Sequence, residues 1–512
     1  MTKKKFFIQG ITLTAFSLFF RITNIGYRSY LSQKIGAEGM GLYQLIFSIF
    51  MLTVTLSTSG ISLAVTRMIT AAIAAGKRNE IKSIVTKCFA FCLGLSLTIS
   101  CLLYFTSDIA AALLLGNPAA SSCLKILGIG LPFMSLCTCM KGYFLAVDES
   151  LSTAGADSVE QILTIGVTIF LFWYFAPQSL ELACLALMVA STLGEMASFT
   201  VNMLVYRRSL KRNTPKFSAK SSGVMKGLSH IALPCTLSSA AKSMLNTGEN
   251  LLIPRELQKF GMSYSTSISQ YGLLQGMAMP MLFFPSSFLF PFASLVMPKI
   301  ARERELNHKN AVAYITGKAI TNSLVYGFFF AAIFIAFGDF WGKAFYNNDI
   351  SGQYLQILAP IVPLIYLDVV VDNLLKGMDE QLHSMKYNFA DSLIRVILIL
   401  VFLSSFGIMS YIVILFLSTI LNAAMSLKRL LDVTNVRILP IRQIFLPLLC
   451  SIISISTAKL LLSGIIGLPI FLMIAMQILL SGGFYLLCLW GISGAFKVNV
   501  YCSKKRSELK EK

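Results

Sequence analysis

The sequence predicts an all-α polytopic membrane protein with about fourteen transmembrane helices, arranged as two pseudo-symmetric six-helix lobes followed by a C-terminal helix pair. Hydrophobic residues make up 56% of the 512 residues and charged residues only 13%, a composition too apolar for a water-soluble domain. Apolar runs continue for about 18 residues or more, the length that crosses a bilayer as a helix. Short motifs also recur at a nearly constant distance along the chain, which indicates two related halves.

The expected helices are the apolar runs between Gly, Pro and charged residues. They cover residues 6–30, 40–74, 82–105, 122–147, 153–176, 180–206, 227–253, 264–298, 311–338, 352–376, 385–405, 409–427, 441–463 and 468–492. Basic clusters fall in every second connection, so the positive-inside rule predicts a multi-pass protein of the cytoplasmic membrane with both termini in the cytoplasm. Termini on the same side require an even number of spans, which fourteen satisfies.

Five segments follow from this pattern. They are an N-terminal lobe (1–210), a basic cytoplasmic linker (211–226), a C-terminal lobe (227–430), an appended helix pair (431–496) and a basic cytoplasmic tail (497–512). The two lobes share residues at matching positions: Ser62 with Ser294 (offset 232), Ile126 with Ile357 and Pro132 with Pro363 (offset 231), and Asp148-Glu149 with Asp379-Glu380. A nearly constant offset predicts that the lobes have the same orientation in the membrane.

The charge and motif content of the sequence limit the classes of function that the protein can have. The formal net charge is +20, from 43 Lys and Arg against 23 Asp and Glu. Because the basic residues cluster between apolar runs, membrane topology and anionic membrane lipids account for them, and we expect no nucleic acid as a partner. The sequence has no G-x-x-x-x-G-K-[ST] phosphate loop, and its cysteines lack metal-ligand spacing. We therefore expect neither an enzyme nor a bound cofactor.

The first apolar run carries a cationic stripe. Arg21 and Arg28 are seven residues apart, so they lie on one face of a helix with Asn24 between them. An arginine facing lipid costs from about 3 to more than 10 kcal/mol, so such residues usually face a wet cavity or a buried partner. We interpret the stripe as a site for an anionic group, because arginine binds phosphate through two parallel hydrogen bonds. The alternative is that Arg28 and Glu38 neutralise each other in packed protein.

The first helix of the second lobe is polar in the same way. Lys242 and Glu249 are seven residues apart, with Asn246 between them and Arg255 farther along the chain. Two such helices, one from each lobe, would line a cavity between the repeats, where repeat-built transporters bind their substrates. Alternatively, Lys242 and Glu249 neutralise each other.

Acidic residues in other runs are candidates for ion coupling. Asp368 and Asp372 are four residues apart, where like charges repel on a helix, so we expect a raised pKa or a bound cation unless the site is a wet helix end. Asp157 and Glu160 are the candidates in the first lobe. Coupling to H+, to Na+ or to the membrane potential would each fit these residues.

Other charges within the runs have simpler interpretations. Asp391 and Arg395, which occupy the place of Asp157 and Glu160 in the second lobe, are four residues apart and can pair with each other. Lys141 lies near a cytoplasmic helix end and is expected to extend toward the lipid headgroups. The sequence assigns no role to the remaining carboxyl group, Glu195.

Three segments carry a family resemblance: IGAEGMGLYQLIFSIF from Ile35, SGISLAVTRMITAAIAAGK from Ser59 and LGIGLPFMSLCTCMKGYFLA from Leu127. With the predicted lobes, they make the chain resemble the stage V sporulation protein B-like, MurJ-related polysaccharide flippases of the MATE-like (MOP) superfamily. The resemblance implies transport of an undecaprenyl-pyrophosphate-linked saccharide, such as a lipid II-like precursor for spore cortex. It also implies that Arg21 and Arg28 bind the pyrophosphate. The second-lobe cation could be Lys242 or Arg255.

Two other functions fit the same architecture. A MATE-type cation-coupled multidrug exporter would favour organic cations in a binding screen and would be expected to have a net acidic cavity. A non-transporting scaffold for cell-wall synthases would keep its activity after substitution of the cationic stripe. In all three cases the chain contacts membrane lipids, and in the last the synthases would be its partners.

Overall fold

The computed structural model describes residues 3–175, 177, 179–213, 224–462 and 469–495. The predicted tail (497–512) and most of the predicted linker (211–226) lie outside these ranges. Within the described residues, all regular secondary structure is helical. The all-α class that the sequence predicts is therefore confirmed.

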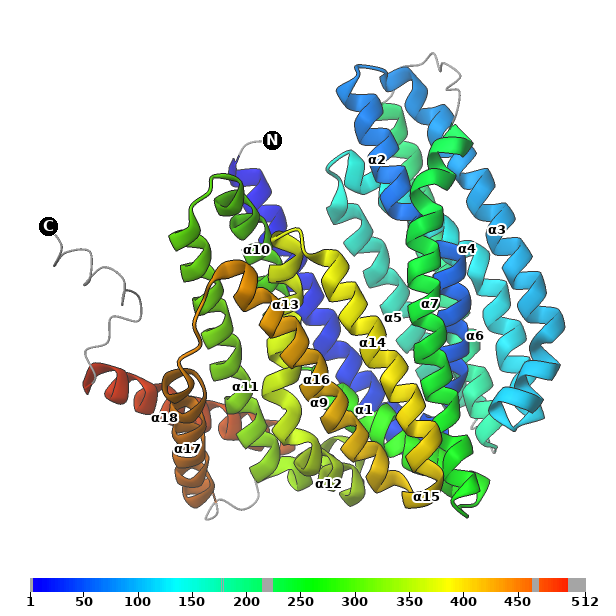
Figure 1. The fold of residues 1–512 in the computed structure, drawn as a ribbon. Coiled ribbons are helices and arrows are strands. Elements are labelled where there is room, and N and C mark those ends of the chain that lie inside the picture. The colour runs from blue at the N-terminus through cyan, green and yellow to red at the C-terminus, as the bar shows by residue number, and fades with distance from the viewer. Residues whose placement is uncertain (1–2, 176, 178, 214–223, 463–468, 496–512) are drawn as a thin grey trace, which may run out of the picture. The chain divides into compact units, whose positions relative to one another are not determined.

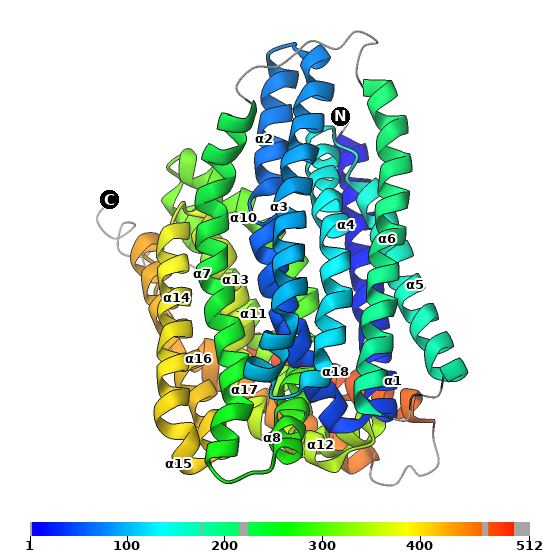
Figure 2. The same cartoon turned by 90° about the vertical axis from the view of Figure 1, so that its right-hand side faces the viewer.

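The chain forms two compact units: residues 1–272 with 399–407, and residues 273–398 with 408–512. The N-terminal unit contains the helices α1 (Lys3–Thr58), α2 (Ile61–Ala74), α3 (Ile81–Ala110), α4 (Ser121–Ala146), α5 (Ser150–Phe175), α6 (Leu180–Asn213), α7 (Val224–Lys259) and α8 (Tyr264–Tyr271), together with the short α15 (Ser404–Phe406). In this unit α2, α3, α4 and α6 run side by side (Figures 1 and 2). The units thus divide after Gly272, whereas the lobes expected from the sequence repeat divide at 211–226 and stay a prediction.

The first helix differs from its predicted form. The sequence predicts separate helices over 6–30 and 40–74, but α1 continues through this gap with a kink at Gly36 (φ 67°, ψ −171°). Only glycine adopts these angles readily, so one residue redirects the helix without a loop. The actual break comes at Gly60, whose φ is 75° and which begins α2.

Close backbone contacts explain the glycines that follow the kink. A Cβ added at Gly41 would lie 2.2 Å from the carbonyl oxygen of Ile268 on α8. A Cβ at Gly272 would similarly lie 2.0 Å from the carbonyl oxygen of Ala37. Ser265, also on α8, donates a 2.6 Å hydrogen bond to the carboxylate of Glu38. The I-G-x-E-G-x-G segment therefore kinks α1 and seats α8 against it.

The helix α7 packs along the second half of α1 and along α2. Thr247 donates a 3.1 Å hydrogen bond to the carbonyl of Ser48, and Thr236 donates one of 2.5 Å to the carbonyl of Ser59. Buried apolar side chains of α2, α3 and α4 form the core next to this contact, with contributions from α6 and α7. The polar helix that the sequence assigns to the second lobe is thus an integral part of the N-terminal unit.

The C-terminal unit contains α9 (Met279–Phe283), α10 (Ser286–Glu305), α11 (Lys309–Tyr346), α12 (Asp349–Leu358), α13 (Val362–Gly377), α14 (Gln381–Leu398), α16 (Ile408–Thr434), α17 (Leu446–Leu462) and α18 (Ile470–Ala495). The predicted run 264–298 is interrupted here, because the chain bends by 51° between the helices that end at Phe283 and begin at Ser286. The bend lies at Pro285, which cannot donate a backbone hydrogen bond. The last two helices, α17 and α18, pack together as a pair.

Span lengths agree with the prediction of about fourteen helices. Among the described residues, eleven helices, or twelve with the bent pair, are long and apolar enough to cross a membrane. One of them, Phe19–Ala74, contains 56 residues, about 84 Å of helix, and holds two predicted spans. The polar α7 corresponds to a further predicted span. The described residues of the fourteen predicted ranges therefore lie almost entirely on helices.

The repeat is visible in the backbone at two helix ends. Asp148 follows α4 and Asp379 follows α13, and both adopt left-handed angles, with φ of 60° and 62°. In each case the next amide reaches back to the helix: Glu149 N donates to Phe144 O and Glu380 N donates to Leu375 O, both at 2.8 Å. These are the six-to-one bonds of a Schellman cap. The sequence match of Asp148-Glu149 with Asp379-Glu380 thus corresponds to one turn built twice.

Candidate functional site

The predicted cationic stripe lies on the first half of α1. Arg21 and Asn24 are exposed and Arg28 is half-buried. Arg28 Nε donates a 3.2 Å hydrogen bond to Asn24 Oδ1, and its charge acts on the nearby hydroxyls of Tyr27 and Tyr43. The three stripe residues therefore share one face of the helix, and the hydrogen bond holds two of them in a fixed arrangement.

The adjacent side of this helix half packs against α5. Gln161 donates a 3.2 Å hydrogen bond to the carbonyl of Phe20, and the hydroxyls of Tyr27 and Thr168 are 3.0 Å apart. The rings of Tyr30 and Phe172 meet edge to face at 6.4 Å. These contacts fix the rotation of α1 about its axis, and so determine which face carries the arginines.

On α7 the predicted residues separate into an exposed and a buried group. Lys242, Asn246 and Arg255 are exposed, whereas Glu249 is only 5% exposed and lies beside Tyr271 of α8. Lys242 makes no ion pair with any residue in the described part of the chain. The alternative in which Lys242 and Glu249 neutralise each other is therefore wrong, and the ammonium group of Lys242 faces outward.

The structure places all seven predicted substrate-binding residues in the N-terminal unit. They are Arg21, Asn24, Arg28, Lys242, Asn246, Glu249 and Arg255. The two helices that carry them do not pack with their cationic faces together, because α7 contacts the part of α1 that follows the Gly36 kink. The stripe on α1 is one local group, and Lys242 belongs to a separate exposed surface of the same unit.

A second polar group links α4, α5 and α6. Lys141 Nζ lies 2.8 Å from Asp157 Oδ1. The carboxyl groups of Glu160 and Glu195 lie next to each other, and Ser198 lies beside Glu160. Lys141 therefore turns across to α5, whereas the sequence predicts that it extends toward the headgroups. The ammonium group of Lys141 is attracted electrostatically by the carboxyl groups of Asp157, Glu160 and Glu195.

Glu195 is the residue that sequence reasoning missed. It is 8% exposed, the deepest of the three carboxyl groups in this cluster. A single acidic residue in an apolar run gives no indication of its partner, because that partner is on another helix. The only available signal was that an isolated carboxyl group inside a span is costly and therefore usually functional.

The C-terminal unit has a polar group on α13, α14 and α16. Asp368 accepts a 3.1 Å hydrogen bond from Asn422, and Asp372 accepts one of 2.5 Å from Ser384. The predicted pairing of Asp391 with Arg395 is confirmed at 2.5 Å. Asp368 and Asp372, the two predicted coupling residues, thus have different hydrogen-bond partners on different helices.

Comparison with known proteins gives a consistent family. The sequence model of the family described as "Polysaccharide biosynthesis protein" matches residues 8–302. Stage V sporulation protein B of Bacillus subtilis (strain 168) is 24% identical over 415 residues, which cover 80% of each chain. The predicted resemblance is confirmed by both findings.

Solved structures agree on the fold. The inward closed conformation of the lipid II flippase MurJ matches with a TM-score of 0.72 at 14% identity, covering 95% of this chain and 100% of that one. An inward-facing multidrug resistance MATE family transporter of the MOP superfamily matches with a TM-score of 0.62 at 15% identity, covering 80% and 94%. The chain thus has the fold seen in these MurJ and MATE structures. The chain belongs to the polysaccharide biosynthesis protein family of multi-span membrane proteins.

Proposed function

We propose that this protein is a flippase that moves an undecaprenyl-pyrophosphate-linked saccharide across the cytoplasmic membrane by alternating access. The observation that carries the proposal is the stripe of Arg21, Asn24 and Arg28 on an apolar helix. A pyrophosphate cannot leave water without compensating charges, and guanidinium groups supply them in a geometry that fits phosphate oxygens. The polyprenyl chain would stay in the lipid while the headgroup moves.

The substrate class follows from the relatives. MurJ is named as a lipid II flippase, and the Bacillus subtilis relative is named for stage V of sporulation. We propose a lipid II-like peptidoglycan precursor, used for spore cortex, with both termini of the chain in the cytoplasm. Lys242 and Arg255 are the candidates for a further contact with the headgroup, since both are exposed basic residues of α7. Cell-wall synthases, which would use the translocated precursor, are the proposed protein partners.

A headgroup-accessibility assay tests the assignment. Purified protein in liposomes with fluorescent lipid II should expose the headgroup on the opposite leaflet. The double variant Arg21→Ala/Arg28→Ala should lose at least about tenfold in rate, because each charged hydrogen bond contributes about 1.5 to 3 kcal/mol. Lys34→Ala is the matched control, since Lys34 is an exposed cation of α1 beyond the stripe, and it should stay within about twofold of the wild type. Wild-type rates in a correctly inserted double variant would refute the proposal.

The carboxyl clusters are the proposed coupling sites. Asp157 and Glu160 belong to the N-terminal cluster, in which three carboxyl groups lie near a single ammonium group, that of Lys141. Asp368 and Asp372 belong to the C-terminal cluster, which holds three carboxyl groups against one guanidinium. Since uncompensated buried charge is costly, we propose that H+ or Na+ binds at these clusters, so that an ion gradient or the membrane potential drives transport.

Removing one titratable group tests this coupling. Glu195→Gln cannot release a proton, so the pH dependence of translocation should flatten while lipid II still binds. Asp349→Asn is the control, because Asp349 is 72% exposed at a helix end. If Glu195→Gln kept the wild-type pH profile, the N-terminal cluster would not be a coupling site.

A further inference from the structure

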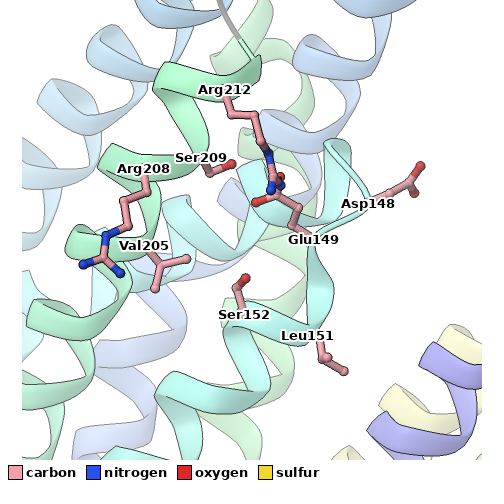
Figure 3. A pocket seen from close by; sticks show the side chains of 8 residues that line it. All are labelled: Asp148, Glu149, Leu151, Ser152, Val205, Arg208, Ser209 and Arg212. Carbon is pink, nitrogen blue, oxygen red and sulfur yellow. The ribbon is translucent and has the colours of Figure 1, made fainter.

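A cavity of about 440 Å³ lies at the end of α6 that carries the basic cluster, next to the turn between α4 and α5 (Figure 3). Its walls come from three elements of the N-terminal unit: this turn, the first turn of α5, and the last turns of α6. It lies far along the chain from the α1 stripe, and none of the predicted site residues lines it.

One wall of the cavity contains the ion pair of Glu149 with Arg212, in which the carboxylate has several hydrogen-bond donors. The carboxylate of Glu149 accepts hydrogen bonds from Arg212, Asn213 and Ser209, the one from Asn213 being 2.9 Å long. The hydroxyl of Ser209 is also 3.1 Å from that of Tyr143. Although burial raises the pKa of Glu149, these hydrogen bonds and the Arg212 charge outweigh it and hold the pKa below its ordinary value. Glu149 is therefore ionised and already neutralised by Arg212.

The other wall carries a cation with no such partner. Arg208 is exposed, lines the cavity, and forms no hydrogen bond or ion pair within the described part of the chain. Asp148, the other acidic residue of the lining, points away from Arg208 (Figure 3). With Glu149 neutralised and Asp148 turned away, the guanidinium of Arg208 determines the charge of the open cavity.

Two further groups favour an anion. Ser152 contributes a hydroxyl to the lining, and the cavity borders the amino-terminal end of α5, a helix of 26 residues. The dipole at such an end attracts negative charge. A planar guanidinium and a hydroxyl together match the oxygens of a phosphate group.

The surroundings indicate a lipid as the source of that phosphate. Leu151, which lines the cavity, is 40% exposed, and Leu204 on the neighbouring turn of α6 is 53% exposed. The helix α6 has 34 residues, about 51 Å in length, which exceeds the roughly 30 Å hydrocarbon thickness and places one end at headgroup level. An amphipathic molecule would use both the cation and the apolar rim, whereas free phosphate would use only the cation.

We propose that this cavity binds the phosphate group of an anionic phospholipid, with Arg208 as the main contact and Leu151 beside the acyl chains. Phosphodiester headgroups with net negative charge gather at the basic side of membrane proteins. The site is separate from the stripe on α1, so it does not depend on which headgroup the protein transports.

Native mass spectrometry of the full-length protein in detergent tests the site. With phosphatidylglycerol added, the wild type should retain one lipid that Arg208→Ala loses, with about a tenfold drop in affinity from the lost charged hydrogen bonds. Lys211→Ala is the matched control, because Lys211 is an exposed cation of the same α6 turn but does not line the cavity. It should stay within about twofold of the wild type.

Two further arms identify the ligand. Phosphatidylcholine, whose headgroup has no net charge, should not occupy the site, and inorganic phosphate should not displace the bound phosphatidylglycerol. Equal retention of both lipids, or equal losses in Arg208→Ala and Lys211→Ala, would overturn the proposal. Displacement by inorganic phosphate would show a soluble anion site and would likewise overturn the assignment to a lipid.

Discussion

The polar network on α4, α5 and α6 and the network on α13, α14 and α16 occupy matching positions in the two units. Residues on the first two helices of each network correspond at an offset of 231, and residues on the third at an offset of 220. The pairs are Cys137 and Asp368, Lys141 and Asp372, Asp157 and Asn388, Glu160 and Asp391, Ser198 and Ser418, and Asn202 and Asn422.

Contacts repeat along with the positions. Asn202 donates to Cys137 Sγ at 3.8 Å, and Asn422 donates to Asp368 Oδ2 at 3.1 Å. Lys141 bonds Asp157 at 2.8 Å, and in the other unit Asn388 donates to Asp372 at 3.4 Å. The helix geometry has therefore been kept in both units while the chemistry at individual positions has changed.

The two networks also contain equal numbers of acidic groups and equal numbers of basic groups. The N-terminal network holds Asp157, Glu160 and Glu195 with Lys141, and the C-terminal network holds three carboxyl groups with Arg395. Each therefore contains three acidic groups and one basic group. The basic group sits on α4 in one unit and on α14 in the other, so different carboxyl groups are neutralised in each.

The largest effect is expected from breaking the ion pair of the C-terminal unit. Asp391→Ala leaves Arg395 without its carboxylate in a site where Asp391 is 8% and Arg395 23% exposed. Loss of one partner of a buried pair costs about 3 kcal/mol, and the unfolding temperature in detergent should fall accordingly. Asp349→Ala, which breaks a surface pair with Lys343, is the control and should cost less than about 1 kcal/mol. Similar losses of stability in both variants would show that the pair of Asp391 with Arg395 contributes no more than an exposed ion pair.

Glu160, which corresponds to Asp391 in the N-terminal network, should lose less stability when its charge is removed. Glu160→Gln keeps a hydrogen-bonding side chain beside Glu195 and leaves Lys141 paired with Asp157. We expect less than about half of the loss seen in Asp391→Ala, because no basic group is left without a partner. A loss of stability as large as that of Asp391→Ala would mean that the carboxyl groups at the two matching positions are equally important for stability.

The next largest loss of stability is expected from substituting a glycine where two helices cross closely. Here the two units should lose similar amounts. A Cβ at Gly142 of α4 would lie 2.7 Å from the carbonyl oxygen of Ser62, and one at Gly377 of α13 would lie 2.7 Å from that of Met297. Gly142→Ala and Gly377→Ala should each cost about 1 to 3 kcal/mol through overpacking. Gly155→Ala, where a Cβ meets nothing within 4 Å, is the control in the same thermal unfolding assay. A large difference between the first two would mean that the crossings are not equivalent.

Sequence reasoning predicted the helices well because the apolar runs are long and are separated by charge. It failed at α1, since a single Gly36 in an unusual conformation redirects a helix without the polar loop that normally marks a boundary. It also failed for Lys141, because a lysine at a helix end looks the same in sequence whether it reaches lipid headgroups or a carboxylate on another helix. Helix periodicity predicts which residues share a face, but not which helices meet.

The candidate site shows the same limit. The spacing of Arg21 and Arg28 predicted a shared face, and Asn24 is hydrogen-bonded to Arg28 on it. The spacing of Lys242 and Glu249 also predicts one face, yet the two side chains differ in burial, because Glu249 packs beside Tyr271 of a helix that follows α7. A contact made by a later segment cannot be predicted from the periodicity of the earlier one.

A smaller effect is expected from exchanging one residue between the networks. Asp157→Asn makes the N-terminal network match Asn388 of the other unit and removes the partner of Lys141. The pair is 38% and 43% exposed, so the loss of stability should be below about 1 kcal/mol. The translocation rate should change more than the stability, because the remaining network gains a positive charge. A stability loss above about 2 kcal/mol would contradict the assignment of this pair as partly exposed.

The smallest effect concerns the repeated turn, where Glu149 pairs with Arg212 and Glu380 with Arg429. The pKa of Glu149 is lowered from the ordinary 4.5, so the folded state binds its proton less readily than the unfolded state. Its contribution to stability is therefore complete above about pH 4.5 and lost as the pH falls through the lowered value. Wild type and Glu149→Gln should keep a constant difference in unfolding temperature from pH 6 to pH 8, and the difference should shrink only on the acid side. A difference that varies near neutral pH would mean that another group titrates with the turn. Arg208, the unpartnered cation of the same cavity, carries a fixed charge at these pH values and could not be that group.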